Sequence, residues 1–188
     1  MNTNTIRPKA VIRSLVVALA AGVLPVAAAT TSADAASSCG IRWGSTPKSA
    51  APMVAGPVTG VRAGRHACYD RLVIDLRGKA PGYTVRYVDA VRTEGAGTVV
   101  PLRGGARLEL VVKAPVTTAA GQAAYRPANP REVVPVTGWT TFRQVAYAGS
   151  FEGQTTFGVG VRARLPFRAF TIQDATGSRL VVDVAHRW

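Results

Sequence analysis

The sequence RLVIDL at residues 71–76 returns near the end of the chain as RLVVDV at residues 179–184. Alternation along a strand would place Leu72 and every second residue after it on one apolar face, and Asp75 on the other face. In the second copy, alternation likewise places every second residue from the leucine onward on one apolar face and Asp183 on the other. Asp75 and Asp183 lie inside these stretches beside arginines, so we expect each of them to form an ion pair on a sheet face. The repeat therefore predicts two matched β-strands that bracket a domain.

Further strand-like segments lie between the two copies, separated by glycine and proline. Strands are predicted from residue 61 onward, at residues 83–91, 99–102, 108–112, 132–136, 141–148, 151–164 and 167–173. Within them, Gly158 and Gly160 indicate a bulge, a bend or the close packing of another chain segment. A long surface loop is predicted over residues 117–130. No amphipathic run of helical length follows residue 35, so the predicted fold is all-β, an antiparallel β-sandwich, with a partly closed β-barrel as the alternative.

The first 35 residues have the layout of a secretory signal peptide, with Arg7, Lys9 and Arg13 ahead of an apolar run and small residues at its end. The run is shorter than the about 20 residues that a membrane-spanning helix needs, so we expect cleavage and no stable membrane anchor. The predicted organisation is a signal peptide over residues 1–35, an irregular segment over 36–59 and a β-domain over 60–188. The predicted location is secreted or associated with the cell wall.

Cys39 and Cys68 are the only cysteines of the chain. An exported protein is in an oxidising compartment, which predicts a disulfide between them, with two buried thiols as the alternative. Lipid attachment at Cys39 is a further alternative, although residues 36–38 lack the aliphatic residue that usually precedes a lipidated cysteine. Two cysteines and two distant histidines do not form a zinc set, and no cofactor motif is present, so we expect neither a metal nor a cofactor.

The chain has a formal net charge of +13, and removal of the signal peptide, with three basic residues and one acidic residue, leaves +11. A protein with this charge is attracted to polyanions such as wall polymers, anionic lipids or nucleic acid. Export argues against nucleic acid as the partner.

The sequence contains little that resembles a set of catalytic residues. His66 lies four positions before Asp70 and His186 three positions after Asp183, so each histidine could form a pair with a carboxylate. Ser150 has a glycine frame, but Gly-Ser-x-x-Gly is not the Gly-x-Ser-x-Gly nucleophile elbow. We therefore predict that the protein is not an enzyme.

Recognition is the remaining class of function. Arginines bind carboxylates and phosphates through paired N–H groups, and aromatic rings stack on sugars. The candidate ligand-binding residues are Arg162, Arg164, Arg168, Tyr87, Trp139 and Tyr147. Arg162 and Arg164 would share one face of a strand and form a basic stripe with Arg168. The alternatives are core packing for each aromatic residue and a solvated strand face for the arginines.

Three stretches, GRHACYDRLVIDL, VAYAGSFEGQTTFGVGVRARLPFRAF and SRLVVDVAHRW, are similar to the AMIN-like family of secreted actinobacterial proteins. The repeated strand itself resembles the AMIN domain of cell-envelope proteins, which often precedes peptidoglycan amidases. The resemblance runs from about Cys39 to Trp188. It implies a non-catalytic cell-envelope module that binds peptidoglycan or an anionic wall polymer as a monomer. The alternatives are a small exported hydrolase and a secreted β-domain that binds or inhibits another protein through a strand edge.

Overall fold

A computed structural model describes Met1 and residues 38–188. The predicted signal peptide, apart from Met1, lies outside the described residues, as does the beginning of the predicted irregular segment. The described chain contains a short 3-10 turn, Ser38–Gly40, and nine β-strands in two sheets.

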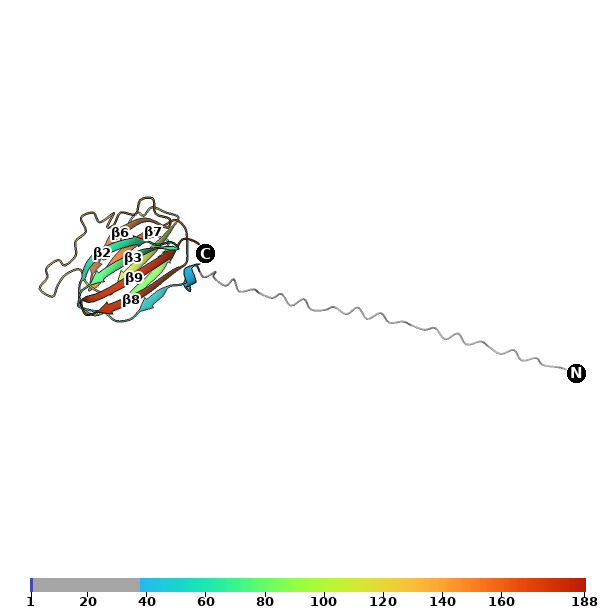
Figure 1. Ribbon diagram of the computed structural model, residues 1–188, viewed down its shortest axis with the longest axis horizontal. Coiled ribbons are helices and arrows are strands. Elements are labelled where there is room, and N and C mark those ends of the chain that lie inside the picture. Colours follow the sequence, from blue (N-terminus) through green and yellow to red (C-terminus); the bar gives the residue numbers. More distant parts are fainter. Residues whose placement is uncertain (2–37) are drawn as a thin grey trace. The chain divides into compact units, whose positions relative to one another are not determined.

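One sheet has five strands in the order β1-β4-β5-β7-β6, and all neighbours are antiparallel. Its strands are β1 (Lys48–Ala50), β4 (Tyr83–Val88), β5 (Ala106–Val112), β6 (Phe142–Phe151) and β7 (Gln154–Val161). The other sheet has four antiparallel strands in the order β2-β3-β9-β8, which lie side by side in Figure 1. Its strands are β2 (Val58–Arg65), β3 (Tyr69–Leu76), β8 (Phe167–Asp174) and β9 (Gly177–Ala185).

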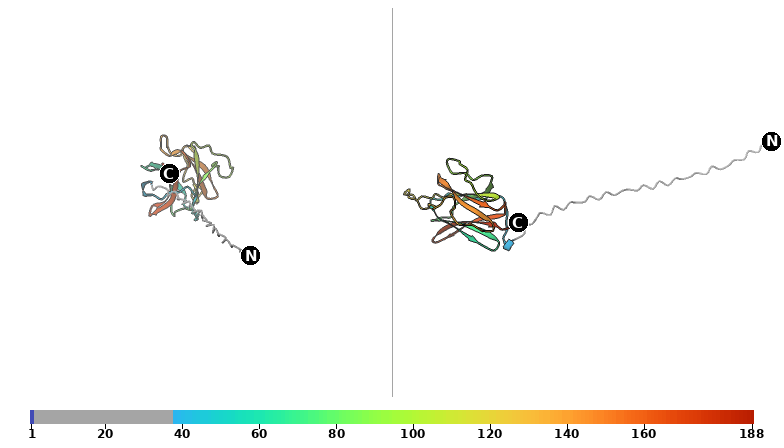
Figure 2. Two further views of the ribbon diagram at one scale, coloured as in Figure 1. Left: turned by 90° about the vertical axis from the view of Figure 1, so that its right-hand side faces the viewer. Right: turned by 90° about the horizontal axis from the view of Figure 1, so that it is seen from above.

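The two sheets form the layers of an antiparallel sandwich (Figure 2), and neither closes into a barrel. The core between them contains the apolar face of both repeated stretches, as their alternation predicts. The largest side chains that are completely or almost completely buried there are Phe142, Phe157, Phe167, Leu72, Ile74, Leu108, Leu110 and Leu180. The predicted fold class is therefore confirmed.

The two copies of the repeat are β3 and β9, and they pair with each other in the middle of the four-stranded sheet. Their antiparallel register is centred on Val73, which lies opposite Val181. An arginine two positions before this centre in one strand therefore faces an aspartate two positions after it in the other. The repeat thus encodes two cross-strand Arg–Asp pairs as well as two apolar faces.

The connection between β4 and β5, residues 89–105, packs on the outer face of the five-stranded sheet, and we call it the covering loop. Its Leu102 is buried there. Gly158 and Gly160 of β7 make this possible, since a Cβ at Gly158 would lie 2.7 Å from Leu102 Cδ1 and a Cβ at Gly160 would collide with the carbonyl oxygen of Arg103. Of the three explanations that the sequence offers for these glycines, the structure shows the close packing of another segment.

Replacing Gly160 with alanine should lower the free energy of unfolding by about 1–3 kcal/mol, because the added methyl group would push the covering loop off the sheet. Gly64 of β2 provides the control, since its nearest neighbour would be the flexible His66 side chain, 3.7 Å away. We expect Gly64→Ala to be neutral or stabilising by up to about 1 kcal/mol. Urea denaturation measures both values, and equal effects would contradict the packing role of Gly160.

Two predicted strands do not form. Residues 99–102 belong to the covering loop, where Val99 makes an isolated bridge to Arg92, and residues 132–136 belong to the long connection between β5 and β6. Their alternating apolar residues cover a sheet or the core without joining a ladder. The predicted surface loop at residues 117–130 is part of the same long connection. The predicted strand at residues 151–164 is divided, because the chain turns after Phe151 and bends after Val161. The predicted irregular segment contains β1 and the beginning of β2.

Candidate functional site

Arginines collect at the end of the sandwich where β4 and β7 finish and β5 and β6 begin. The antiparallel register brings these strand ends together, since Val88 pairs with Arg107 and Phe142 with Val161. We call this the arginine end, defined by Arg103, Arg107, Arg131, Arg143, Arg162 and Arg164. Asp89 and Glu132 are the acidic residues among the pocket linings of this end.

A cleft of about 290 Å³ opens at this end between β4, β5 and the bend after β7. We call it the tyrosine cleft, lined by Tyr87, Val88, Asp89, Gly105, Ala106, Arg107 and Arg164. The Tyr87 hydroxyl donates to the carbonyl oxygen of Leu165 at 2.6 Å and accepts from its N–H at 2.9 Å. Burial raises the pKa of Tyr87 to about 12, so the hydroxyl remains a donor at neutral pH. Tyr87 thereby holds the bend, and with it Arg164, against β4.

The tyrosine cleft has two guanidinium groups available for a ligand. Among the described residues, the arginines with a carboxylate partner are Arg62, Arg71, Arg86, Arg103, Arg168 and Arg179. Arg107 and Arg164 have no carboxylate partner in the described chain, and Arg164 lies over the Tyr87 ring at 4.8 Å from its centroid. With the exposed Asp89, the lining has a net charge of +1. Two guanidinium groups beside an aromatic ring suit a ligand with anionic groups.

The C-terminal residues lie beside the tyrosine cleft. The Trp188 indole N–H donates to the carbonyl oxygen of Arg164 at 3.2 Å, and the Arg162 guanidinium donates to the carbonyl oxygen of His186 at 2.6 Å. Trp188 is 57% exposed. An exposed aromatic ring is therefore attached to the backbone of Arg164, one of the residues that line the tyrosine cleft.

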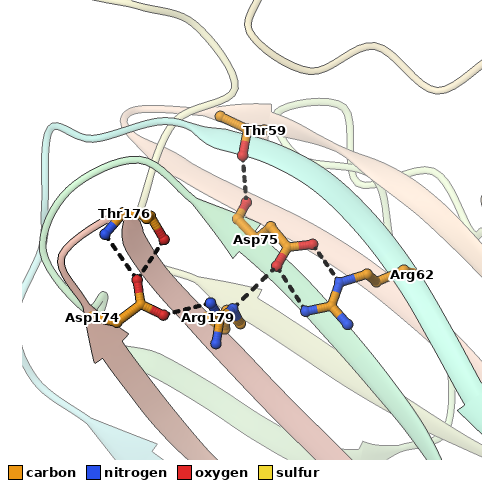
Figure 3. A network of polar contacts seen from close by, with 6 residues as sticks. All are labelled: Thr59, Arg62, Asp75, Asp174, Thr176 and Arg179. Carbon is orange, nitrogen blue, oxygen red and sulfur yellow. Dashed lines mark hydrogen bonds and ion pairs between the residues drawn. The ribbon is translucent and has the colours of Figure 1, made fainter.

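The outer face of the four-stranded sheet carries the ion pairs that the repeat predicts. Asp183 is completely buried and accepts from Arg71 at 2.6 and 2.9 Å and from Arg168 at 2.7 Å. In the other copy, Asp75 accepts from Arg62 at 2.8 Å and lies 3.8 Å from Arg179 (Figure 3). The predicted ion pairs are confirmed, and their arginines already have a carboxylate partner within the sheet.

The network in Figure 3 continues from Arg179 to Asp174, at 2.5 Å. The hydroxyl and the backbone N–H of Thr176 also donate to Asp174, at 2.6 and 2.9 Å. These hydrogen bonds, together with Arg179, lower the pKa of Asp174 to about 2. The turn between β8 and β9 is therefore closed by a carboxylate that remains ionised at neutral pH.

The repeated strands and the residues around them also decide the family. A family model described as the AMIN-like domain matches residues 56–186, which is most of the chain and includes β2 to β9. The protein belongs to the AMIN-like family. Neither the curated proteins nor the solved structures compared with it give a match. Membership confirms the resemblance found in the sequence and identifies a cell-envelope module. AMIN-like domains are generally non-catalytic binding modules.

In this AMIN-like domain, three of the predicted ligand-binding residues lie in or beside the tyrosine cleft. Tyr87 and Arg164 line the tyrosine cleft, and Arg162 lies beside the C-terminal residues. The predicted stripe along a strand does not form, because β7 ends at Val161 and the two arginines follow in the bend. The fold brings Arg164 to Tyr87 through the bend instead.

The other three predicted residues do not line the tyrosine cleft. Arg168 of β8 binds Asp183 and lies among the rings of Trp43, Tyr69 and Phe170 at 5.0–5.7 Å. Trp139 stacks on Phe142 with 6.1 Å between ring centroids, and Tyr147 packs on Phe157 at 5.7 Å. Both aromatic residues are half-buried against the core.

Arg107 is the cleft residue that the sequence did not single out. The predicted strand at residues 108–112 alternates so that Leu108 and Leu110 share the buried face. The same alternation, extended by one residue, would have placed Arg107 on the outer face. Its proximity to Tyr87 and Arg164 depends on how the strand ends meet, which no local pattern shows.

The histidines do not form the pairs expected from the sequence. His186 Nε2 lies 3.1 Å from Asp70 Oδ1, so His186 pairs with Asp70 and not with Asp183. His66 stacks on Tyr69 at 4.5 Å between centroids. The Ser150 hydroxyl donates to the carbonyl oxygen of Gln154 in the β6–β7 turn, at the opposite end of β6 from the His186 pair. These positions do not assemble a nucleophile with a base.

The predicted disulfide joins Cys39 to Cys68, with 6.2 Å between their Cα atoms. It ties the segment that carries Trp43 to the beginning of β3, and Trp43 is 7% exposed there, 5.7 Å from Tyr69. Closing the loop between Cys39 and Cys68 stabilises the fold by roughly 3–4 kcal/mol in the chain-entropy account. Residues 38–188 contain no cluster of three metal-binding side chains and no helix that could span a membrane.

Proposed function

We propose that this AMIN-like domain is a secreted, non-catalytic module that binds peptidoglycan or an anionic wall polymer through the tyrosine cleft. In this proposal residues 1–35 are a cleaved signal peptide, and residues 60–188 act as a monomeric binding domain. One observation carries the proposal: Arg107 and Arg164 line the same cleft without a carboxylate partner in the described chain.

The chemistry of the cleft supports an anionic glycan as the ligand. Carboxylates and phosphates on wall polymers match the paired N–H groups of arginine, and a sugar ring can stack on the exposed Trp188 beside Arg164. The charge of +11 that remains after the predicted cleavage would attract the same polymers over a longer range. The envelope association of the family supports this choice of polyanion.

The double variant Arg107→Ala/Arg164→Ala should bind insoluble peptidoglycan at least about tenfold more weakly, because each charge-assisted hydrogen bond contributes about 1.5–3 kcal/mol. Co-sedimentation across a salt series measures the affinity. Arg77→Ala/Arg126→Ala removes the same charge from two exposed arginines outside the cleft, and we expect it to change the affinity by less than about twofold.

The same assay identifies the polymer. Binding that survives removal of the anionic polymers and about 0.5 M salt, where charge attraction extends only a few ångströms, would indicate peptidoglycan itself. Binding that disappears with the anionic polymers would indicate those polymers. If both double variants lose affinity equally, net charge alone explains the binding and the cleft has no special role.

A further inference from the structure

A second pocket at the arginine end lies between the covering loop and the connection that precedes β6. It has a volume of about 520 Å³ and is lined by Pro101, Leu102, Arg103, Asn129, Arg131, Glu132 and Gln144. Its residues are distinct from those of the tyrosine cleft. We call it the Arg131 pocket.

Gln144 of β6 holds both walls of the Arg131 pocket in place. This side chain is only 5% exposed, and its Oε1 accepts from the backbone N–H of Arg103 at 2.9 Å. Its Nε2 donates to the carbonyl oxygen of Arg131, also at 2.9 Å. Asn129 Oδ1 accepts from the backbone N–H of Arg131 at 2.9 Å. Both backbone polar groups of Arg131 are therefore anchored, so the pocket is organised before any ligand arrives.

The two arginines of the pocket differ in what their guanidinium groups contact. Arg103 donates to the carbonyl oxygen of Arg143 at 2.9 Å and forms an ion pair with Glu132 at 2.5 Å. The Arg131 guanidinium makes no hydrogen bond or ion pair with any described residue. The lining therefore has a net charge of +1. The unpaired positive charge belongs to Arg131, whose backbone is held by two hydrogen bonds. This arrangement matches one monoanion.

We propose that the Arg131 pocket binds the carboxyl terminus of a short peptide. The terminal carboxylate would accept two N–H groups from Arg131, and the last side chain would pack on Pro101 and Leu102. The Glu132 carboxylate, whose side chain is 33% exposed, is available to accept a peptide N–H. It also disfavours a dianionic phosphate, because its negative charge borders the same pocket.

Titration of the oxidised protein with N-acetyl-alanyl-alanine, followed by amide chemical shifts or calorimetry, tests this proposal. We expect saturable binding of the acid and at least about tenfold weaker binding of the same peptide as its C-terminal amide, because only the acid presents a carboxylate to Arg131. Acetate should bind more weakly than the peptide, since it lacks the apolar residue and the amide. Peptides of D- and L-alanine would show whether the site prefers a wall peptide or the end of a protein chain.

Arg131→Ala should abolish the preference for the acid. Arg131→Lys should retain part of it, because lysine keeps the charge but not the paired N–H groups. Arg126→Ala, which removes an exposed arginine outside the pocket, should bind like the unaltered protein. Equal binding of acid and amide, no saturable binding, or an unchanged preference in Arg131→Ala would overturn the proposal. Because Arg107→Ala/Arg164→Ala should bind the peptide normally, failure here is distinguishable from failure of the glycan-binding proposal.

Discussion

Replacing Asp183 with alanine should lower the free energy of unfolding by about 3 kcal/mol, because two arginines would lose a completely buried partner. The carboxylate accepts from Arg71 and Arg168, whose side chains are 25% and 32% exposed. This partial exposure lets water solvate the freed guanidinium groups, so the expected loss is at the lower end of the range for a broken buried ion pair. Urea denaturation measures the change.

The other copy of the repeat supplies a matched control. Asp75 has the same position in β3 and also faces two arginines, but its side chain is 30% exposed. We expect Asp75→Ala to cost about 1 kcal/mol or less, as is usual for ion pairs near solvent. If the two substitutions cost the same, burial does not decide the contribution of these pairs, and the explanation given for Asp183 fails.

Asp70→Ala should also cost about 3 kcal/mol, because it leaves two buried backbone donors without an acceptor. Asp70 is completely buried, and its Oδ2 accepts from the N–H groups of Thr141 and Phe142 at 2.7 and 2.8 Å. Since Asp70 belongs to β3 and Phe142 begins β6, this carboxylate joins the two sheets of the sandwich. Urea denaturation measures the loss, and hydrogen exchange at the Thr141 and Phe142 amides should become faster.

Asp70→Asn separates the role of the acceptor from that of the charge. The amide oxygen can still accept both backbone N–H groups, and the amide nitrogen can donate to Nε2 of neutral His186. We therefore expect Asp70→Asn to retain most of the stability. A loss as large as that of Asp70→Ala would show that the ionic contact with His186 matters more than the two backbone hydrogen bonds.

Sequence patterns predicted the structure correctly where their physical basis lies within a single strand. The repeat predicted β3 and β9, their buried faces and their ion pairs, because side-chain alternation is a property of the strand itself. Alternation at residues 99–102 and 132–136 was misleading, since it reports an apolar face and not a hydrogen-bonded neighbour. The expected stripe of Arg162 and Arg164 does not form because alternation assumes that the strand continues, whereas the chain bends after Val161.

The amino-acid sequence by itself determined the all-β class, the cysteine pairing, the family and the excess of positive charge. These follow from composition, periodicity and short motifs, which do not depend on how distant segments meet. Only the tertiary structure decided that His186 pairs with Asp70, that Arg107 and Arg164 share the tyrosine cleft, and that Gln144 organises the Arg131 pocket. Each of these arrangements joins residues far apart in the chain, and it depends on strand register and on the way loops pack against the sheets.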